Sequence, residues 1–104
     1  MKRDLVRIEG IKTVGIEIEE GARGVIAVYF RVSNEAVAET LEVVDDVFVD
    51  VDRKGALVGI EMINPKHVQI SKIIKRVSRD YGRSALNDIS TKRLKRIEEL
   101  VGAG

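Results

Sequence analysis

The sequence predicts a small α+β domain, with a mainly antiparallel five-stranded β-meander sheet followed by two C-terminal helices. Three observations lead to this prediction. Short β-branched segments alternate with turn residues as far as residue 64, the period becomes helical at Pro65, and the helical pattern after it is basic and amphipathic. Since 104 residues suffice for one core, we expect a single domain, 1–104, with an acidic sheet part (1–65) and a basic helical part (66–104).

Each expected strand follows from a local pattern of apolar and turn residues. Residues 14–19 alternate apolar and polar side chains, whereas 25–32 is apolar on both faces, as in a central strand. Turn residues at 33–35 and 45–46 separate the next segments. The five expected strands are 14–19, 25–32, 37–44, 47–52 and 56–63.

The change to a helical period predicts two helices. The first is expected to begin at Asn64 and Pro65, an N-cap residue followed by a favoured first helical residue, and to end at Gly82. Its apolar side carries Ile70, Ile73, Ile74, Val77 and Tyr81. The second helix is expected at about 91–101, with Gly102 as its stop.

Composition excludes several classes of site. The chain has no cysteine and one histidine, so disulfides, thiolate metal sites and histidine clusters are excluded. No apolar run is long enough to span a membrane and no secretory leader is evident, so we expect a cytoplasmic protein without a membrane partner. Charged residues make up 34% and the side-chain amides number four, a composition typical of heat-adapted proteins.

Charge is divided unevenly along the chain. Residues 1–65 carry 8 Lys and Arg against 13 Asp and Glu, a net charge of −5, whereas residues 66–104 carry 10 against 4, a net charge of +6. The partner of the basic part is expected to be nucleic acid, an acidic protein surface or the acidic half of the same molecule.

The stretch from Asp50 to Glu61 resembles a calcium-binding loop in its spacing of Asp50, Asp52, Gly55 and Glu61. Position 5 of such a loop supplies an oxygen ligand, and here it is Lys54, while the flanking segments are strands rather than helices. A turn explains the stretch better. Asp52 suits the first place of a type I turn and Gly55 suits the positive φ of the bulge after it.

If this hairpin forms in simple alternation, both of its faces are apolar. One face is expected to carry Val47, Val49, Val51, Leu57 and Ile63, and the other Phe48, Val58, Ile60 and Met62. The helices can cover one face, and a second copy of the chain can cover the other, which predicts a homodimer. The alternative is that the N-terminal segment covers that face within one chain.

Residues 25–63 resemble a known family. The stretches "VIAVYFRV", "VAETLEVVDDVFVDVD" and "RKGALVGIEMI" are similar to the strands and signature hairpin of the domain of unknown function 2283 family, small β-rich prokaryotic proteins. The approach to the first strand and the long basic C-terminal tail depart from the family pattern. The resemblance implies no established activity, but the frequent occurrence of members beside small ribonuclease-type toxins implies an antitoxin or partner-binding role.

No catalytic constellation is evident in the sequence. His67 has no identifiable partner, and the carboxylate pairs Asp45–Asp46 and Asp50–Asp52 suit a turn and a solvated strand end. We therefore expect no enzyme, no catalytic residue, no cofactor and no metal site, with a carboxylate metal-dependent enzyme as the third hypothesis.

The first functional hypothesis is thus a non-enzymatic protein-interaction module, as a homodimer and as an antitoxin-like partner of a small toxin. The second is DNA or RNA binding through the basic helices, although a solvated cationic face that offsets the acidic sheet explains the same charges. The residues of this surface are Lys72, Lys75, Arg76, Arg79, Arg83, Lys92, Lys95 and Arg96.

Overall fold

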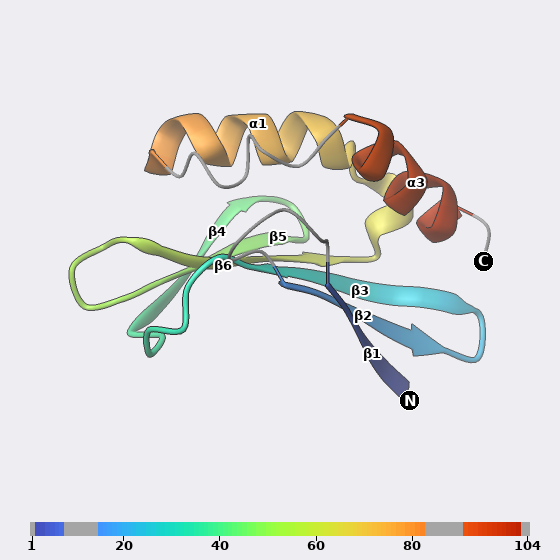
Figure 1. Ribbon diagram of the computed structural model, residues 1–104, viewed down its shortest axis with the longest axis horizontal. Helices are drawn as coiled ribbons and strands as arrows, with labels where there is room; N and C mark the ends of the chain where they lie inside the picture. The colour runs from blue at the N-terminus through green and yellow to red at the C-terminus, as the bar shows by residue number, and fades with distance from the viewer. Residues whose placement is uncertain (1, 8–14, 83–90, 103–104) are drawn as a thin grey trace.

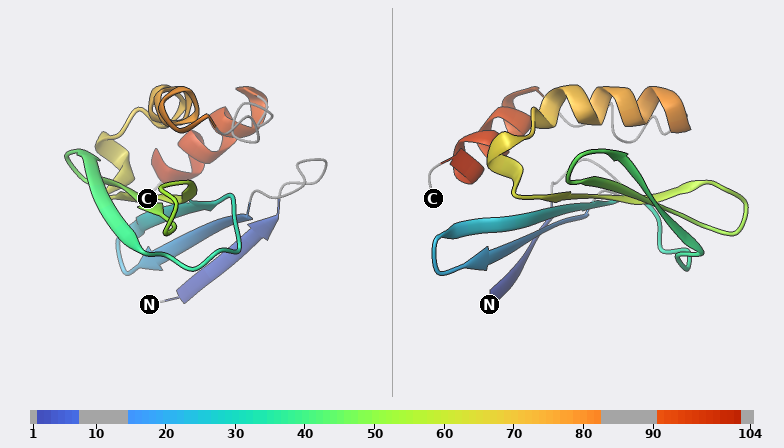
Figure 2. Two further views of the ribbon diagram at one scale, coloured as in Figure 1. Left: turned by 90° about the vertical axis from the view of Figure 1, so that its left-hand side faces the viewer. Right: turned by 180° about the vertical axis from the view of Figure 1, so that it is seen from behind.

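The computed structural model describes residues 2–7, 15–82 and 91–102, which form a sheet with helices against one of its faces (Figures 1 and 2). The predicted fold class, an α+β domain with an antiparallel sheet followed by two helices, is confirmed. None of the described helices is long and apolar enough to cross a membrane. The elements are β1 (Lys2–Arg7), β2 (Gly15–Gly21), β3 (Gly24–Arg31), β4 (Glu39–Val44), β5 (Val47–Val51), β6 (Leu57–Ile63), the 3₁₀ helix η1 (Pro65–His67), α1 (Ile70–Tyr81) and α3 (Thr91–Gly102).

All five predicted strands form, as β2 to β6, and β1 adds a sixth at one edge. Every pairing is antiparallel, and the strand order is β1-β2-β3-β6-β5-β4. The sequential meander is interrupted at one place, because β6 rather than β4 pairs with β3. Residues 32–38 connect β3 to the far edge of the sheet, where β4 is the outermost strand and mostly exposed.

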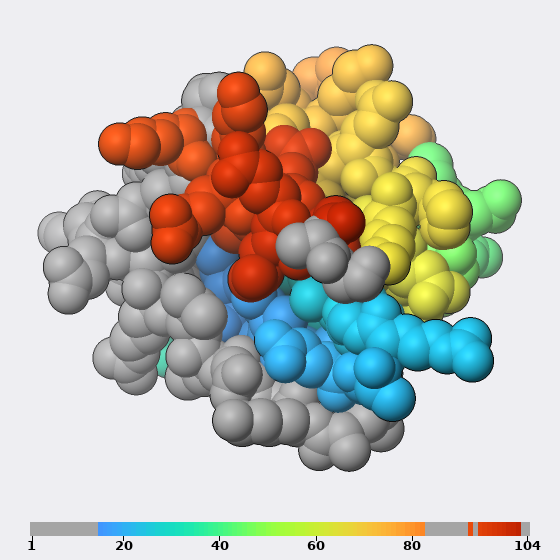
Figure 3. Space-filling model, turned by 90° about the vertical axis from the view of Figure 1, so that its right-hand side faces the viewer, coloured from blue at the N-terminus to red at the C-terminus, as the bar shows by residue number. Residues whose placement is uncertain are grey.

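The core lies between the sheet and the two helices. From the sheet it contains residues such as Ile16, Phe30 and Ile60, all at most 1% exposed. Ile70, Ile74 and Val77 of α1 pack on this layer, as predicted from the helical period, and Ile73 and Tyr81 lie at its margin. Figure 3 shows α3 beside η1 and above the ends of β2 and β3, where Leu94 and Val101 join the same cluster.

The predicted division of the β5–β6 hairpin into two apolar faces is wrong. Val49 pairs with Ile60 and Val47 with Met62, so these four side chains share one face. The reason is a register shift beside Asp50, where β6 contains one residue more than β5 and the alternation moves by one position. This face is the one buried beneath the helices, so the argument for a second apolar face is lost.

The first helix begins later than predicted. Residues 65–67 form the separate 3₁₀ helix η1, and Val68 is extended before α1 starts at Ile70. Asn64 adopts a left-handed conformation, with φ of 50°, and its side chain makes no capping hydrogen bond. The chain must turn sharply from β6 onto the helical layer, and the left-handed residue together with the buried Pro65 makes this turn. The end at Gly82, with φ of 65°, is as predicted.

The turn between β5 and β6 is held by the side chain of Asp52. Its Oδ1 accepts hydrogen bonds from the backbone N–H of Lys54 (2.8 Å) and of Ala56 (2.9 Å), and the backbone N–H of Gly55 donates to its carbonyl oxygen (3.0 Å). Gly55 has φ of +80°, and nothing lies within 4 Å of the place a Cβ would take. The need for glycine there is therefore conformational rather than steric.

Replacing Gly55 with Val should lower the free energy of unfolding by about 1–3 kcal/mol, because a β-branched residue disfavours positive φ. Chemical denaturation of the two proteins measures the difference. Gly55→Asn is the matched control, since asparagine tolerates the left-handed region and should cost less. Equal stability of all three proteins would contradict the proposed role of the backbone conformation.

Candidate functional site

The sheet face opposite the helices carries a row of alternating carboxylates and aromatic rings. Cross-strand pairing places Glu17 opposite Tyr29, Tyr29 opposite Glu61, Glu61 opposite Phe48 and Phe48 opposite Glu42. Because directly opposed residues share a face, all five side chains project to the same side. We call this set the acidic-aromatic row. It crosses five strands, β2, β3, β6, β5 and β4, and spans about 19 Å at the usual strand spacing.

Tyr29 is fixed across the neighbouring strand. Its hydroxyl donates a hydrogen bond to Oδ2 of Asp50 on β5 (2.8 Å), and Thr40 of β4 donates to Oδ1 of the same carboxylate (2.6 Å). To reach Asp50 the phenol lies over Gly59 of β6, where an added Cβ would collide with its ring and hydroxyl. Glycine at this position therefore lets the ring lie over the backbone of the sheet.

Tyr29 is kept neutral near physiological pH. Burial, then the hydrogen bond to Asp50 and the negative charge of Asp50, raise the pKa of Tyr29 above its ordinary value of 10, although Arg31 acts in the opposite direction. The Arg31 guanidinium lies over the tyrosine ring, 5.5 Å from its centre, and donates a hydrogen bond to the carbonyl of Ser33 (3.2 Å). A neutral, oriented phenol suits binding rather than proton abstraction or nucleophilic attack.

The carboxylates that the sequence suggested for a metal have structural partners. Asp50 accepts two hydroxyl groups and Asp52 holds the β5–β6 turn, while Asp46 adopts a left-handed turn conformation with φ of 64°. In the part of the chain that the structure describes, no group of three or more His, Asp or Glu side chains is placed to hold a metal ion. His67 is exposed, in η1.

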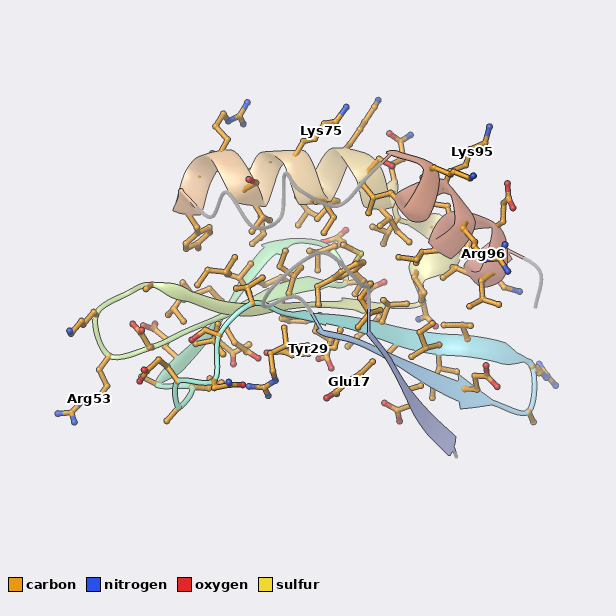
Figure 4. The ribbon with its side chains drawn as sticks, in the orientation of Figure 1. Glu17, Tyr29, Arg53, Lys75, Lys95 and Arg96 are labelled. Carbon is orange, nitrogen blue, oxygen red and sulfur yellow. The ribbon has the colours of Figure 1, made fainter. Side chains whose placement is uncertain are left out.

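Seven of the eight predicted basic residues lie exposed on the two helices, and Arg83 lies outside the described residues. In Figure 4 the side chains of Lys75 and Lys95 point away from the sheet, on the opposite side of the molecule from Glu17 and Tyr29. Arg76 and Arg79 approach Asp80 at 3.7 and 3.3 Å, exposed ion pairs that stabilise little. The cationic helical surface consists of Lys72, Lys75, Arg76, Arg79, Lys92, Lys95 and Arg96.

Sequence reasoning missed the acidic-aromatic row. Its members come from five strands, and their alignment depends on the β3–β6 pairing and on the register shift near Asp50. The signal that was available is the alternation of polar and apolar residues in each strand, which places Glu17 and Glu61 on a solvent-facing side. Nothing in that alternation says which strand lies beside which.

The fold and this face together define a small two-layer α+β domain with a polar, aromatic-containing sheet face opposite its helices. Residues 27–65 match the family described as "Protein of unknown function (DUF2283)", which confirms the resemblance predicted for residues 25–63. The match covers β4, β5, β6 and most of β3, and so includes four of the five members of the acidic-aromatic row. No curated protein and no solved structure matches the chain.

Replacing Gly59 with Ala should lower the free energy of unfolding by about 1–3 kcal/mol, because the new methyl group must displace the Tyr29 phenol from Asp50. Denaturant unfolding measures this cost. In a Tyr29→Ala background the same substitution should cost much less, since the group it displaces is gone. Gly102→Ala, with open space around it, is the matched control. Equal costs in both backgrounds would refute the proposed contact.

Proposed function

We propose that this protein is a non-enzymatic protein-interaction module that binds its partner through the sheet face bearing the acidic-aromatic row. The observation that supports this proposal is the position of Tyr29 and Phe48, two half-buried aromatic side chains on the face opposite the helices. Aromatic side chains are enriched at the centres of protein interfaces, because they contribute a large contact area at a small cost in side-chain entropy. Tyr29 is already oriented by Asp50, which lowers that cost further.

The chemistry of the open face supports binding over catalysis. The Asp50 carboxylate already accepts hydrogen bonds from two neutral side chains, the hydroxyl groups of Tyr29 and Thr40, and Tyr29 itself stays protonated. These groups hold one another in place, as residues that support a binding surface from beneath do. A small toxin, the partner that the family resemblance implies, fits this proposal as one kind of protein partner.

A second copy of the chain is another candidate partner. The homodimer prediction relied on an apolar second face, and the observed face has carboxylates between its aromatic side chains. Two such faces brought together would place like charges near each other, which disfavours a face-to-face dimer. The homodimer therefore stays a prediction, and light scattering of the purified protein measures it.

Affinity capture from the native lysate tests the proposed module. A tagged protein should retain a partner in a fixed ratio after nuclease treatment, and Glu61→Lys should abolish that retention, because it reverses the charge at the centre of the row. Lys75→Glu, on the opposite surface, is the matched control and should leave retention unchanged. A partner lost with Lys75→Glu but kept with Glu61→Lys would overturn the proposal.

The cationic helical surface supports a second candidate function, binding of DNA or RNA. Its seven exposed cations lie on two neighbouring helices, and such a surface can neutralise several phosphates at once. The two helices are in contact, since the Ser71 hydroxyl of α1 donates a hydrogen bond to Glu98 Oε1 of α3 (2.8 Å). A solvated face that balances the acidic sheet remains the competing interpretation.

If the second candidate is correct, the affinity for DNA should fall steeply as salt rises, and Arg76→Glu with Arg79→Glu should weaken it further. Fluorescence anisotropy of a labelled duplex across a salt series measures both effects. Arg53→Glu with Lys54→Glu is the matched control, since both residues are exposed in the β5–β6 turn, away from the helices. Binding that responds to none of these changes would favour the solvated-face interpretation.

A further inference from the structure

The acidic-aromatic row has a regular spacing that restricts what can bind to it. Its carboxylates, at Glu17, Glu61 and Glu42, occur on every second strand, and the aromatic rings of Tyr29 and Phe48 lie on the strands between them. With neighbouring strands about 4.8 Å apart, the backbone positions of successive carboxylates are roughly 10 Å apart. Phe48 stands on the strand midway between Glu61 and Glu42, whereas the Tyr29 ring leans over Gly59 toward Asp50.

This pattern complements one face of a basic amphipathic helix. Residues at i and i+7 of an α-helix lie on the same face and about 10.5 Å apart, with i+3 and i+4 between them. Cations at i and i+7 can therefore meet two carboxylates of the row while an apolar residue at i+3 or i+4 contacts the ring between them. An extended strand fits less well, because its same-face residues recur about every 6.7 Å.

The charge of the face selects against other partners. Within the described part of the chain, the side chains of Glu42 and Glu61 make no hydrogen bond or ion pair, so both carboxylates can pair with incoming cations. The same negative charge repels the phosphates of nucleic acids and anionic lipids. A basic protein segment is the complementary occupant.

From this geometry we infer that the acidic-aromatic row is the docking surface for a basic amphipathic helix of a partner protein. Lys or Arg residues spaced by seven pair with Glu61 and Glu42, and an apolar residue midway between them packs on Phe48. The inference rests on the proposed interaction function and specifies the partner's chemistry.

Two synthetic peptides of identical composition test the inference. In the first, a stapled helix carries Lys at i, i+7 and i+14 with Leu midway between them; in the second, the Lys residues follow a five-residue spacing that spreads them around the helix. Fluorescence anisotropy with the full chain should show that the first peptide binds at least tenfold more tightly. Equal binding of the two peptides, or no binding of either, would overturn the inference.

Two variants assign the binding to the row. Glu42→Gln combined with Glu61→Gln removes two charges without changing side-chain size. It should weaken the affinity for the first peptide roughly tenfold, as expected for two partly exposed ion pairs. Glu35→Gln combined with Glu99→Gln also removes two exposed carboxylates, one in the β3–β4 connection and one on α3, and should have little effect. Equal weakening by both would indicate general attraction to an acidic protein and would contradict the inference.

The outcome is separable from the test of the proposed function. If capture depends on Glu61 but neither peptide binds, the proposed function as an interaction module is supported and the inference of a basic helical partner fails. If ultracentrifugation shows that Glu61→Lys converts a dimer of this chain to monomers, the occupant is a second copy and the inference fails. If capture fails while the first peptide binds selectively, the proposed function is contradicted although the face retains its specificity.

Discussion

The alternation of side chains along β6 determines how the rest of the molecule is arranged. Ile60 and Met62 point toward the helices and are fully buried, whereas Gly59 and Glu61 lie on the opposite face. Since β6 lies between β3 and β5, its register aligns the neighbours on both sides. A slip of one residue would expose the core residues and bury Glu61, a large cost that fixes the register. The core and the acidic-aromatic row therefore depend on the same pairing.

The side chains of the open face are ordered around Gly59, which has no side chain of its own. Gly59 leaves room for the Tyr29 ring, which crosses β6 and donates its hydroxyl to Asp50, and Thr40 holds the other oxygen of that carboxylate. Side chains from β3, β5 and β4 are thus linked across the sheet. This linkage restrains the rotamer of Tyr29 in the folded chain, so a partner of the proposed kind would have a smaller entropy cost to meet on binding.

How much the sequence could predict depends on the range of the interaction involved. The strands, the two helices, the apolar side of α1 and the turn at Gly55 follow from local period and turn chemistry, and all of them form. The insertion of β6 between β3 and β5 depends on contacts between distant segments, and β1 has too few apolar residues to give a strand pattern of its own.

Two details of the prediction were wrong for local reasons. The register shift near Asp50 changes which residues of the β5–β6 hairpin share a face, and this removes the argument for a dimer. The predicted start of the first helix was also wrong. Asn64 and Pro65 are a good local helix signal, but here they make the turn that leads from β6 to α1. The cationic helical surface was predictable, because the helical period alone determines which charged residues share one side of a helix.

The separation of charge between the layers has a consequence for binding. The helices carry the cationic helical surface on their outer side, and the sheet carries carboxylates on the face turned away from them. A polyanion and a polycation can therefore each find a complementary surface on the same molecule, but neither can use both, because each is repelled by the other layer. The two surfaces are distinguishable by their response to charge reversal at single positions, since a change on one layer leaves the other layer's contacts in place. A basic helical partner on the sheet would leave the cationic helices open to solvent, so occupation of one surface does not exclude a ligand on the other.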